Sequence, residues 1–143
     1  MLDDADRIWN RACDPFAHFS GTGDRALQAV LRVHGQVMNA GLLSALEYID
    51  PDGIHGAIAG LRYFRLEGAA RSLAEGFDAA FPAGAVPDPD ARGDHVEALD
   101  DDVYARLEDI EGGYHAAIPS DDVLEAAFRE RLAEAPGDFA PLE

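Results

Sequence analysis

The sequence contains no lysine, so all 11 of its basic residues are arginines, and they are outnumbered by 28 aspartates and glutamates. The formal net charge at pH 7 is therefore −17. Nucleic acids and anionic membranes carry charge of the same sign, which disfavours direct binding to either of them. If a charged partner exists, we expect it to be cationic.

Cysteine and long hydrophobic runs are also scarce. Cys13 is the only cysteine, so it forms no internal disulfide, and a reducing compartment is expected. The longest strongly apolar stretch, residues 37–49, is interrupted by polar residues and falls short of the roughly 20 residues that a membrane span needs. The acidic residues 1–6 differ from the basic and then apolar start of a secretory signal. We therefore expect a cytoplasmic protein that binds no membrane.

Apolar residues recur at intervals of three and four, the period of a helix that packs one face against a core. Strand-like alternation of any length is absent, and no repeat of fixed period occurs. We predict an all-α fold, a single compact domain of residues 1–143 with about six to eight helices. The expected helices cover residues 3–13, 27–38, 42–49, 54–64, 69–81, 100–110 and 120–135. Helical spacing also predicts ion pairs, namely Asp3 with Arg7, Asp102 with Arg106, and Glu125 with Arg129.

Proline and glycine mark the expected interruptions. Residues 82–98 contain Pro82, Pro87 and Pro89 with several glycines and aspartates, so this Pro/Gly/Asp-rich stretch is predicted to be a connecting loop. Gly112-Gly113 is expected to weaken the helix that begins near Asp100.

No catalytic motif is recognisable. None of the serines lies in a Gly-x-Ser-x-Gly turn. Ser20-Gly21-Thr22-Gly23 resembles a phosphate-binding turn but lacks its lysine and its preceding strand, so an ordinary loop and helix cap is favoured. The five histidines are not spaced like metal ligands, and His34, on an apolar helix face, is interpreted as a hydrogen-bonded core or interface residue. We expect no enzymatic activity, no cofactor and no bound metal.

The negative charge is concentrated in the C-terminal part, because residues 1–87 hold 11 acids and 7 arginines whereas residues 88–143 hold 17 acids and 4 arginines. The acids that open two helices are explained by the helix dipole, but Glu108, Asp109 and Glu111 are not. Solubility is the simplest alternative explanation, and a protein-binding surface is the functional one. The candidate partner-binding residues are Asp100, Asp101, Asp102, Glu108, Asp109, Glu111, Asp121, Asp122 and Glu125.

The stretch Val37-Met38-Asn39-Ala40-Gly41-Leu42 resembles the Asn-Gly-Gly-Phe signature of the DMP19-like family. The context is similar over most of the chain, with a tryptophan helix before it, an Asp-Pro-Asp-Gly turn after it, and a closing segment at residues 128–139. The chain departs from the family at Ala40, Leu42 and Ser44, where glycine, phenylalanine and glutamine are usual. For the motif residues Asn39 and Gly41, a helix cap or a local hydrogen bond is favoured over a binding role.

The resemblance implies an all-helical fold and, for the known DNA mimic of the family, an acidic surface that occupies the DNA-binding face of a transcription regulator. Together with the acidic C-terminal part, it leads us to expect a protein-binding module that mimics DNA toward a basic DNA-binding protein. Two alternatives stay open: a small immunity, antitoxin-like or regulatory protein that caps a basic partner, and a DMP19-like domain without DNA mimicry. An enzyme is the weakest alternative. The oligomeric state also stays open, a homodimer included.

Overall fold

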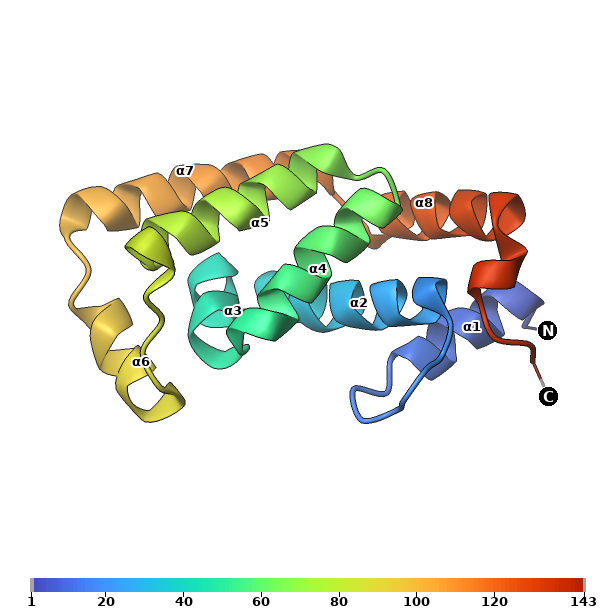
Figure 1. Ribbon diagram of the computed structural model, residues 1–143. Helices are drawn as coiled ribbons and strands as arrows, with labels where there is room; N and C mark the ends of the chain where they lie inside the picture. Colours follow the sequence, from blue (N-terminus) through green and yellow to red (C-terminus); the bar gives the residue numbers. More distant parts are fainter. Residues whose placement is uncertain (1, 143) are drawn as a thin grey trace.

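The computed structural model describes residues 2–142. These residues form eight α-helices and two short 3-10 turns, with no β-strand among them (Figure 1), so the all-α prediction is confirmed. None of the described helices is long and apolar enough to cross a bilayer. The helices are α1 (Asp4–Ala12), α2 (Thr22–Ala40), α3 (Leu42–Tyr48), α4 (Pro51–Tyr63), α5 (Glu67–Ala80), α6 (Pro89–Glu97), α7 (Asp101–Ala117) and α8 (Asp121–Glu134).

The helices α2, α4, α5 and α7 pack in succession, α2 against α4, α4 against α5, and α5 against α7. In Figure 1, α5 and α7 run side by side along one edge, and α8 extends that edge beyond α7. Helix α6 lies at one end of the molecule, whereas α1 and the C-terminal segment after α8, up to residue 142, lie at the other. We call these the α6 end, which contains α6 and the start of α7, and the termini end, which contains α1, α8 and the C-terminal segment.

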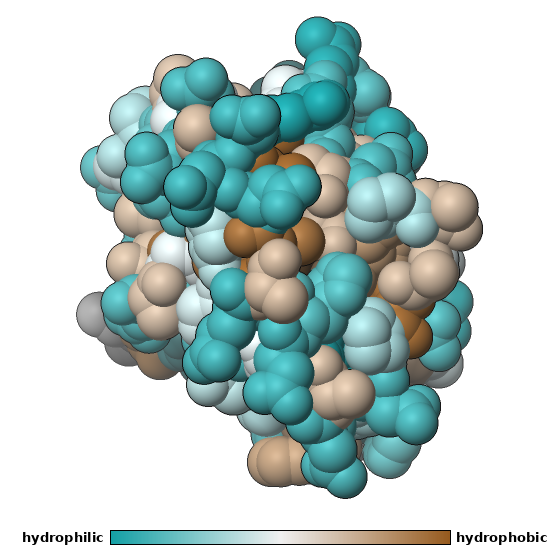
Figure 2. Space-filling model, turned by 90° about the vertical axis from the view of Figure 1, so that its left-hand side faces the viewer, coloured by the Kyte–Doolittle hydropathy of each residue, from teal (hydrophilic) through white to brown (hydrophobic). Residues whose placement is uncertain are grey.

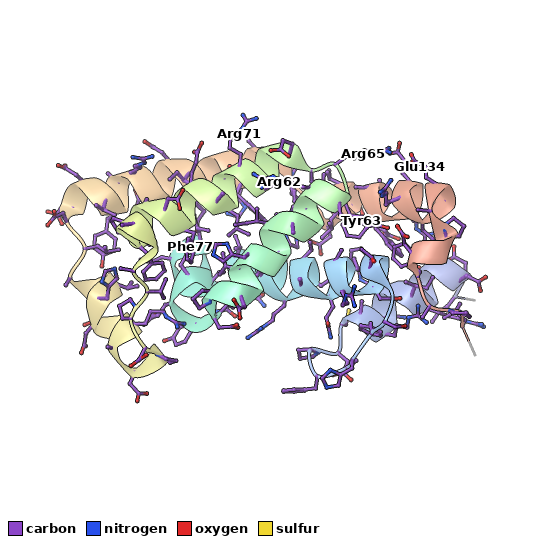
Figure 3. All side chains as sticks on the ribbon, viewed as in Figure 1. Arg62, Tyr63, Arg65, Arg71, Phe77 and Glu134 are labelled. Carbon is purple, nitrogen blue, oxygen red and sulfur yellow. The ribbon has the colours of Figure 1, made fainter. Side chains whose placement is uncertain are left out.

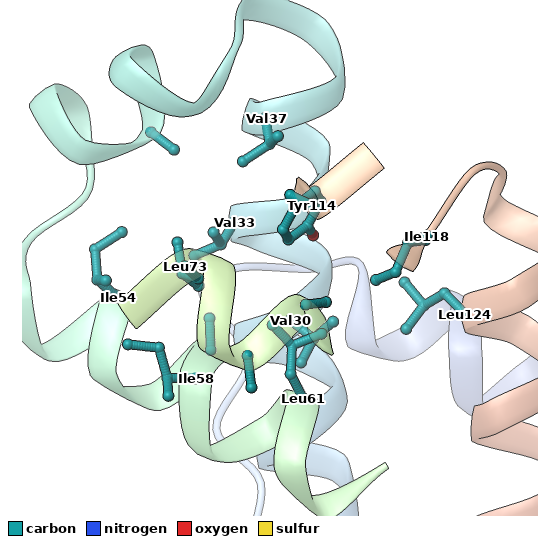
Figure 4. Close-up of a cluster of buried hydrophobic side chains, with 14 of the residues drawn as sticks. Val30, Val33, Val37, Ile54, Ile58, Leu61, Leu73, Tyr114, Ile118 and Leu124 are labelled. Atoms are coloured by element: carbon teal, nitrogen blue, oxygen red, sulfur yellow. The ribbon is translucent and has the colours of Figure 1, made fainter. Parts of the chain in front are cut away.

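The hydrophobic core is built where α2, α4, α5 and α7 meet (Figure 4). Helix α4 approaches α2 closely at Gly60, where a Cβ atom would lie 2.7 Å from the carbonyl oxygen of Ala26. Most of the apolar face predicted for α2 is confirmed, because Leu27, Val30 and Val37 are almost fully buried, but Met38, which was expected on the same face, is 42% exposed. The core side chains labelled in Figure 4 are Val30, Val33, Val37, Ile54, Ile58, Leu61, Leu73, Tyr114, Ile118 and Leu124.

The prediction of a loop over residues 82–98 was wrong for its second half, where Pro89–Glu97 form α6. Pro89 occupies the first turn, which tolerates proline because its missing N–H has no partner there. Tertiary contacts then hold the helix. The Arg92 side chain is buried, and its guanidinium donates to the carbonyl oxygens of Glu47 and Ile49 at the end of α3, at 3.2 and 3.4 Å. His95 stacks on the Phe81 ring.

Helix α7 continues through Gly112-Gly113 to Ala117, so these glycines do not end it near residue 110 as expected. Ile110 and Tyr114, on either side of the pair, are both buried, and their packing outweighs the low helix propensity of glycine. Gly113 also serves the contact with α5, since a Cβ atom there would lie 3.2 Å from Ser72 Oγ.

Candidate functional site

Six of the nine candidate acids lie on α7 or immediately before it. Five of them are exposed, and Glu111 is half-buried. Asp101 and Glu108 are seven residues apart, as are Asp102 and Asp109, so each pair lies on one side of the helix at an axial separation of about 10 Å. The inward side of α7 is apolar, with Leu107, Ile110 and Tyr114 buried. The outward side of α7 therefore carries two short rows of carboxylates.

Residues 88–111, hereafter the acidic segment, contain ten acids and two arginines, a net charge of −8. Within residues 2–142 no ion pair includes a member of this segment. Arg92 is buried against backbone carbonyls, and the pair expected from the spacing of Asp102 and Arg106 does not form. The carboxylates of the acidic segment thus have no arginine partner among the described residues.

The termini end is different, because arginines there pair with several acids, although Asp4 and Glu130 belong to no ion pair of the described residues. Arg129 contacts Asp3 at 2.8 Å, Asp6 at 2.9 Å and Glu125 at 3.1 Å, which confirms the expected pairing of Glu125 with Arg129. The Arg129 guanidinium, together with the backbone N–H of Asp6, lowers the pKa of Asp3 to about 2. These charges hold α1 against α8.

A second arginine joins the α4–α5 junction to α8. Arg65 lies 2.6 Å from Glu134, and the two side chains face one another across the surface in Figure 3. The Arg65 guanidinium lowers the pKa of Glu134, which is also 3.6 Å from Arg131. Charge at this end therefore contributes to helix packing.

The three candidate acids of α8 do not behave alike. Glu125 is paired with Arg129, Asp121 accepts a hydrogen bond from His34 at 2.9 Å, and Asp122 is exposed and outside every ion pair of the described residues. The structure thus separates the nine predicted residues into engaged and unengaged carboxylates. The unengaged ones lie mainly on α7.

The interpretation of His34 as a hydrogen-bonded core histidine is confirmed. Its side chain is buried, with Nδ1 2.8 Å from the Tyr114 hydroxyl and Nε2 2.9 Å from Asp121. Burial, and then the charge of Asp121, raise the pKa of Tyr114, so this hydroxyl stays protonated. A neutral imidazole satisfies both contacts, accepting from Tyr114 and donating to Asp121. The three residues link α2, α7 and α8.

The motif residues lie beside α7. Gly41 has φ +95°, a conformation that favours glycine, and its N–H donates to the Val37 carbonyl at 2.8 Å, which confirms its predicted role as a helix cap. Glu111 accepts a hydrogen bond from the N–H of Leu42 at the start of α3. Asn39 is exposed, and no side-chain hydrogen bond of Asn39 occurs within residues 2–142, so its expected local bond does not form.

The glycines of Ser20-Gly21-Thr22-Gly23 receive the C-terminal segment. A Cβ atom on Gly23 would lie 2.5 Å from the Phe139 ring, and one on Gly21 would lie 2.6 Å from the carbonyl oxygen of Asp138. The carboxylate of Asp24, in the first turn of α2, accepts from Arg11 and from a backbone N–H of the same segment. The start of α2 is therefore occupied by the chain's own groups.

Figure 2 views the α6 end, where hydrophilic residues cover much of the surface and a smaller hydrophobic area lies between them. Among the residues that the structure describes, no three His, Cys, Asp or Glu side chains are grouped so that they could hold a metal ion.

Comparison of the chain with protein-family models, with curated proteins and with solved structures found no match. The resemblance to the DMP19-like family stays a prediction from the sequence.

Proposed function

We propose that this chain is a binding protein that acts as a DNA mimic, placing the carboxylates of α7 and the acidic segment in the DNA-binding groove of a cationic protein. The observation that supports this most directly is the division of charge. At the termini end, arginines pair with four acids, whereas no arginine of the described residues pairs with the acidic segment. Solubility alone requires no such separation.

The spacing of the carboxylates suits this role. Each DNA strand carries one phosphate per about 3.4 Å of helix axis. Acids two turns apart on α7 are separated by about 10 Å, close to three phosphate steps. Cationic groups that are spaced to bind every third phosphate of a DNA strand could therefore contact successive carboxylates of α7. Complementary charge would also speed association and make binding weaken as salt increases.

Mimicry is tested by capture from lysate at low salt, with duplex DNA as the competitor. DNA-binding proteins should be retained and then released by DNA, because both ligands would use one surface. A retained partner that DNA does not displace would contradict mimicry.

Charge-neutralised variants then locate the surface. Asp102→Asn, Glu108→Gln and Asp109→Asn together should weaken binding by about tenfold, since each exposed contact contributes roughly 0.5 kcal/mol. The matched control is Asp4→Asn, Asp52→Asn and Glu130→Gln, which removes the same three charges from α1, α4 and α8. Equal losses in both variants would indicate an effect of net charge, without a defined surface.

A second candidate is a protein that caps a basic toxin or enzyme mainly by shape. Two aromatic side chains favour it, because Phe16 is 86% exposed and Tyr48 is 71% exposed. Exposed aromatic residues commonly dominate the energy of protein interfaces. Under this alternative, Phe16→Ala or Tyr48→Ala would weaken binding more than the three charge changes on α7, and DNA would not compete.

A further inference from the structure

A hollow of about 250 Å³ lies between α7 and the junction of α2 with α3. It is smaller than the roughly 300–1,000 Å³ of sites for drug-sized ligands, so its size suits a single side chain. The hollow contains the family-motif glycine and two of the candidate acids. Its lining residues are Ala40, Gly41, Leu42, Leu43, Tyr104, Leu107, Glu108 and Glu111.

The lining combines an apolar floor with two carboxylates. Leu42 and Leu107 are buried, and Leu43 is partly exposed. The hydroxyl of Tyr104 donates to the Val96 carbonyl. An occupant therefore meets the hydrocarbon part of the tyrosine and the leucines.

The carboxylates lie on the same side of α7, because Glu108 and Glu111 are three residues apart. Glu108 is exposed and belongs to no ion pair of the described residues. Glu111 uses one oxygen, Oε1, to accept from the N–H of Leu42, and this bond holds its carboxylate at the hollow. One carboxylate is thus held by a backbone hydrogen bond, and the other is exposed and in no ion pair of the described residues.

We propose that this hollow receives an arginine side chain of the cationic partner, an inference that rests on the proposed binding function. The aliphatic stem of arginine would cover the leucines, and its guanidinium would reach both glutamates. Arginine fits better than lysine, because its planar group donates to two carboxylates at once and packs flat against an aromatic ring. A partner that presents arginines to DNA phosphates would carry this group. The acids of α7 would then attract the partner, and the hollow would hold it.

The test uses N-acetyl-arginine amide as the probe and N-acetyl-citrulline amide, its uncharged equivalent, as the control, with the full chain observed by ¹H–¹⁵N NMR. The arginine probe should shift the amide signals of Gly41, Leu42 and Leu43 saturably. The citrulline probe should bind at least fivefold more weakly, because it loses the charge-assisted contacts. Equal binding of the two probes, or shifts elsewhere on the chain, would overturn the proposal.

Two variants check the assignment. Glu108→Gln should weaken arginine binding about fivefold, whereas Glu130→Gln on α8, with the same loss of charge, should leave it unchanged. Leu43→Phe fills the hollow and should block the probe, with amide signal dispersion showing that the fold persists. Unchanged arginine binding by a folded Leu43→Phe variant would refute the site.

The outcomes separate this inference from the proposed function. DNA-competed capture that survives Leu43→Phe would leave mimicry standing and reject the arginine site. Probe binding in the hollow without any DNA-competed partner would support the arginine site and reject mimicry.

Discussion

Asp24→Ala should lower the stability of this protein by about 3 kcal/mol. The Asp24 carboxylate is fully buried and accepts hydrogen bonds from Arg11 at 2.7 Å and from the N–H of Ala140 at 2.7 Å. Removing one member of a buried charge pair typically costs 3–5 kcal/mol, because the other charge loses its partner. We take the lower end because the Arg11 side chain is 24% exposed and water partly compensates it.

Urea unfolding followed by circular dichroism measures this loss. With a slope of about 2 kcal/mol per molar urea, the midpoint should fall by roughly 1.5 M. The control is Glu67→Ala, which breaks the exposed Arg62–Glu67 pair and should cost less than about 1 kcal/mol. Hydrogen exchange at Ala140 should also accelerate in Asp24→Ala. An unchanged midpoint would refute the idea that Asp24 anchors the C-terminal segment.

Two further predictions concern the same end of the molecule. Gly23→Ala should destabilise by about 1–3 kcal/mol in the same urea assay, because its Cβ would lie 2.5 Å from the Phe139 ring; a neutral result would mean that the segment shifts freely. The Asp3 pKa, about 2 when folded and 3.8 ordinarily, means that the Asp3–Arg129 contact stabilises the fold above about pH 4 and is lost as the pH falls toward 2. The midpoint difference between wild type and Asp3→Asn, whose Asn still caps α1, should therefore be full at pH 6 and mostly lost at pH 2; a pH-independent difference would contradict this.

Sequence reasoning predicted the helices that present a continuous apolar face, and it failed where long-range contacts decide the structure. Helix α2 was predicted from its periodicity, because Leu27, Val30 and Val37 recur at helical spacing and are buried in the core. Helix α6 has no such face. It is held by Arg92, which donates to the carbonyls of Glu47 and Ile49, 45 and 43 residues away. The local sequence around Arg92 does not predict such a long-range contact. The expected weakening of α7 at Gly112-Gly113 was wrong for the same reason, because the burial of Tyr114 outweighs the low helix propensity of the two glycines.

The sequence predicted which acidic residues belong to the candidate site, but it did not predict which groups those residues contact. Counting charges located the acidic segment, and helical spacing gave the rows on α7. The sequence did not show that Asp121 contacts His34, 87 residues away, or that Glu111 binds the backbone of Leu42, 69 residues away. Helical spacing also predicted three arginine pairs, of which only that of Glu125 forms, and Asp3 pairs with Arg129 in place of Arg7. Long-range partners decide which carboxylates a binding protein can reach.

The acids of α7 are expected to oppose folding slightly, and this distinguishes a binding surface from a structural one. The acidic segment has a net charge of −8 and no ion pair within residues 2–142, so its carboxylates repel one another. Glu108→Gln with Asp109→Asn should therefore leave the free energy of unfolding unchanged or raise it by a few tenths of a kcal/mol in low salt, as measured by urea unfolding. The gain should disappear in about 1 M salt, where the screening length is about 3 Å. A lower midpoint in this double variant would mean that these carboxylates stabilise the fold. Their presence would then be explained by stability, and it would no longer support a role in binding.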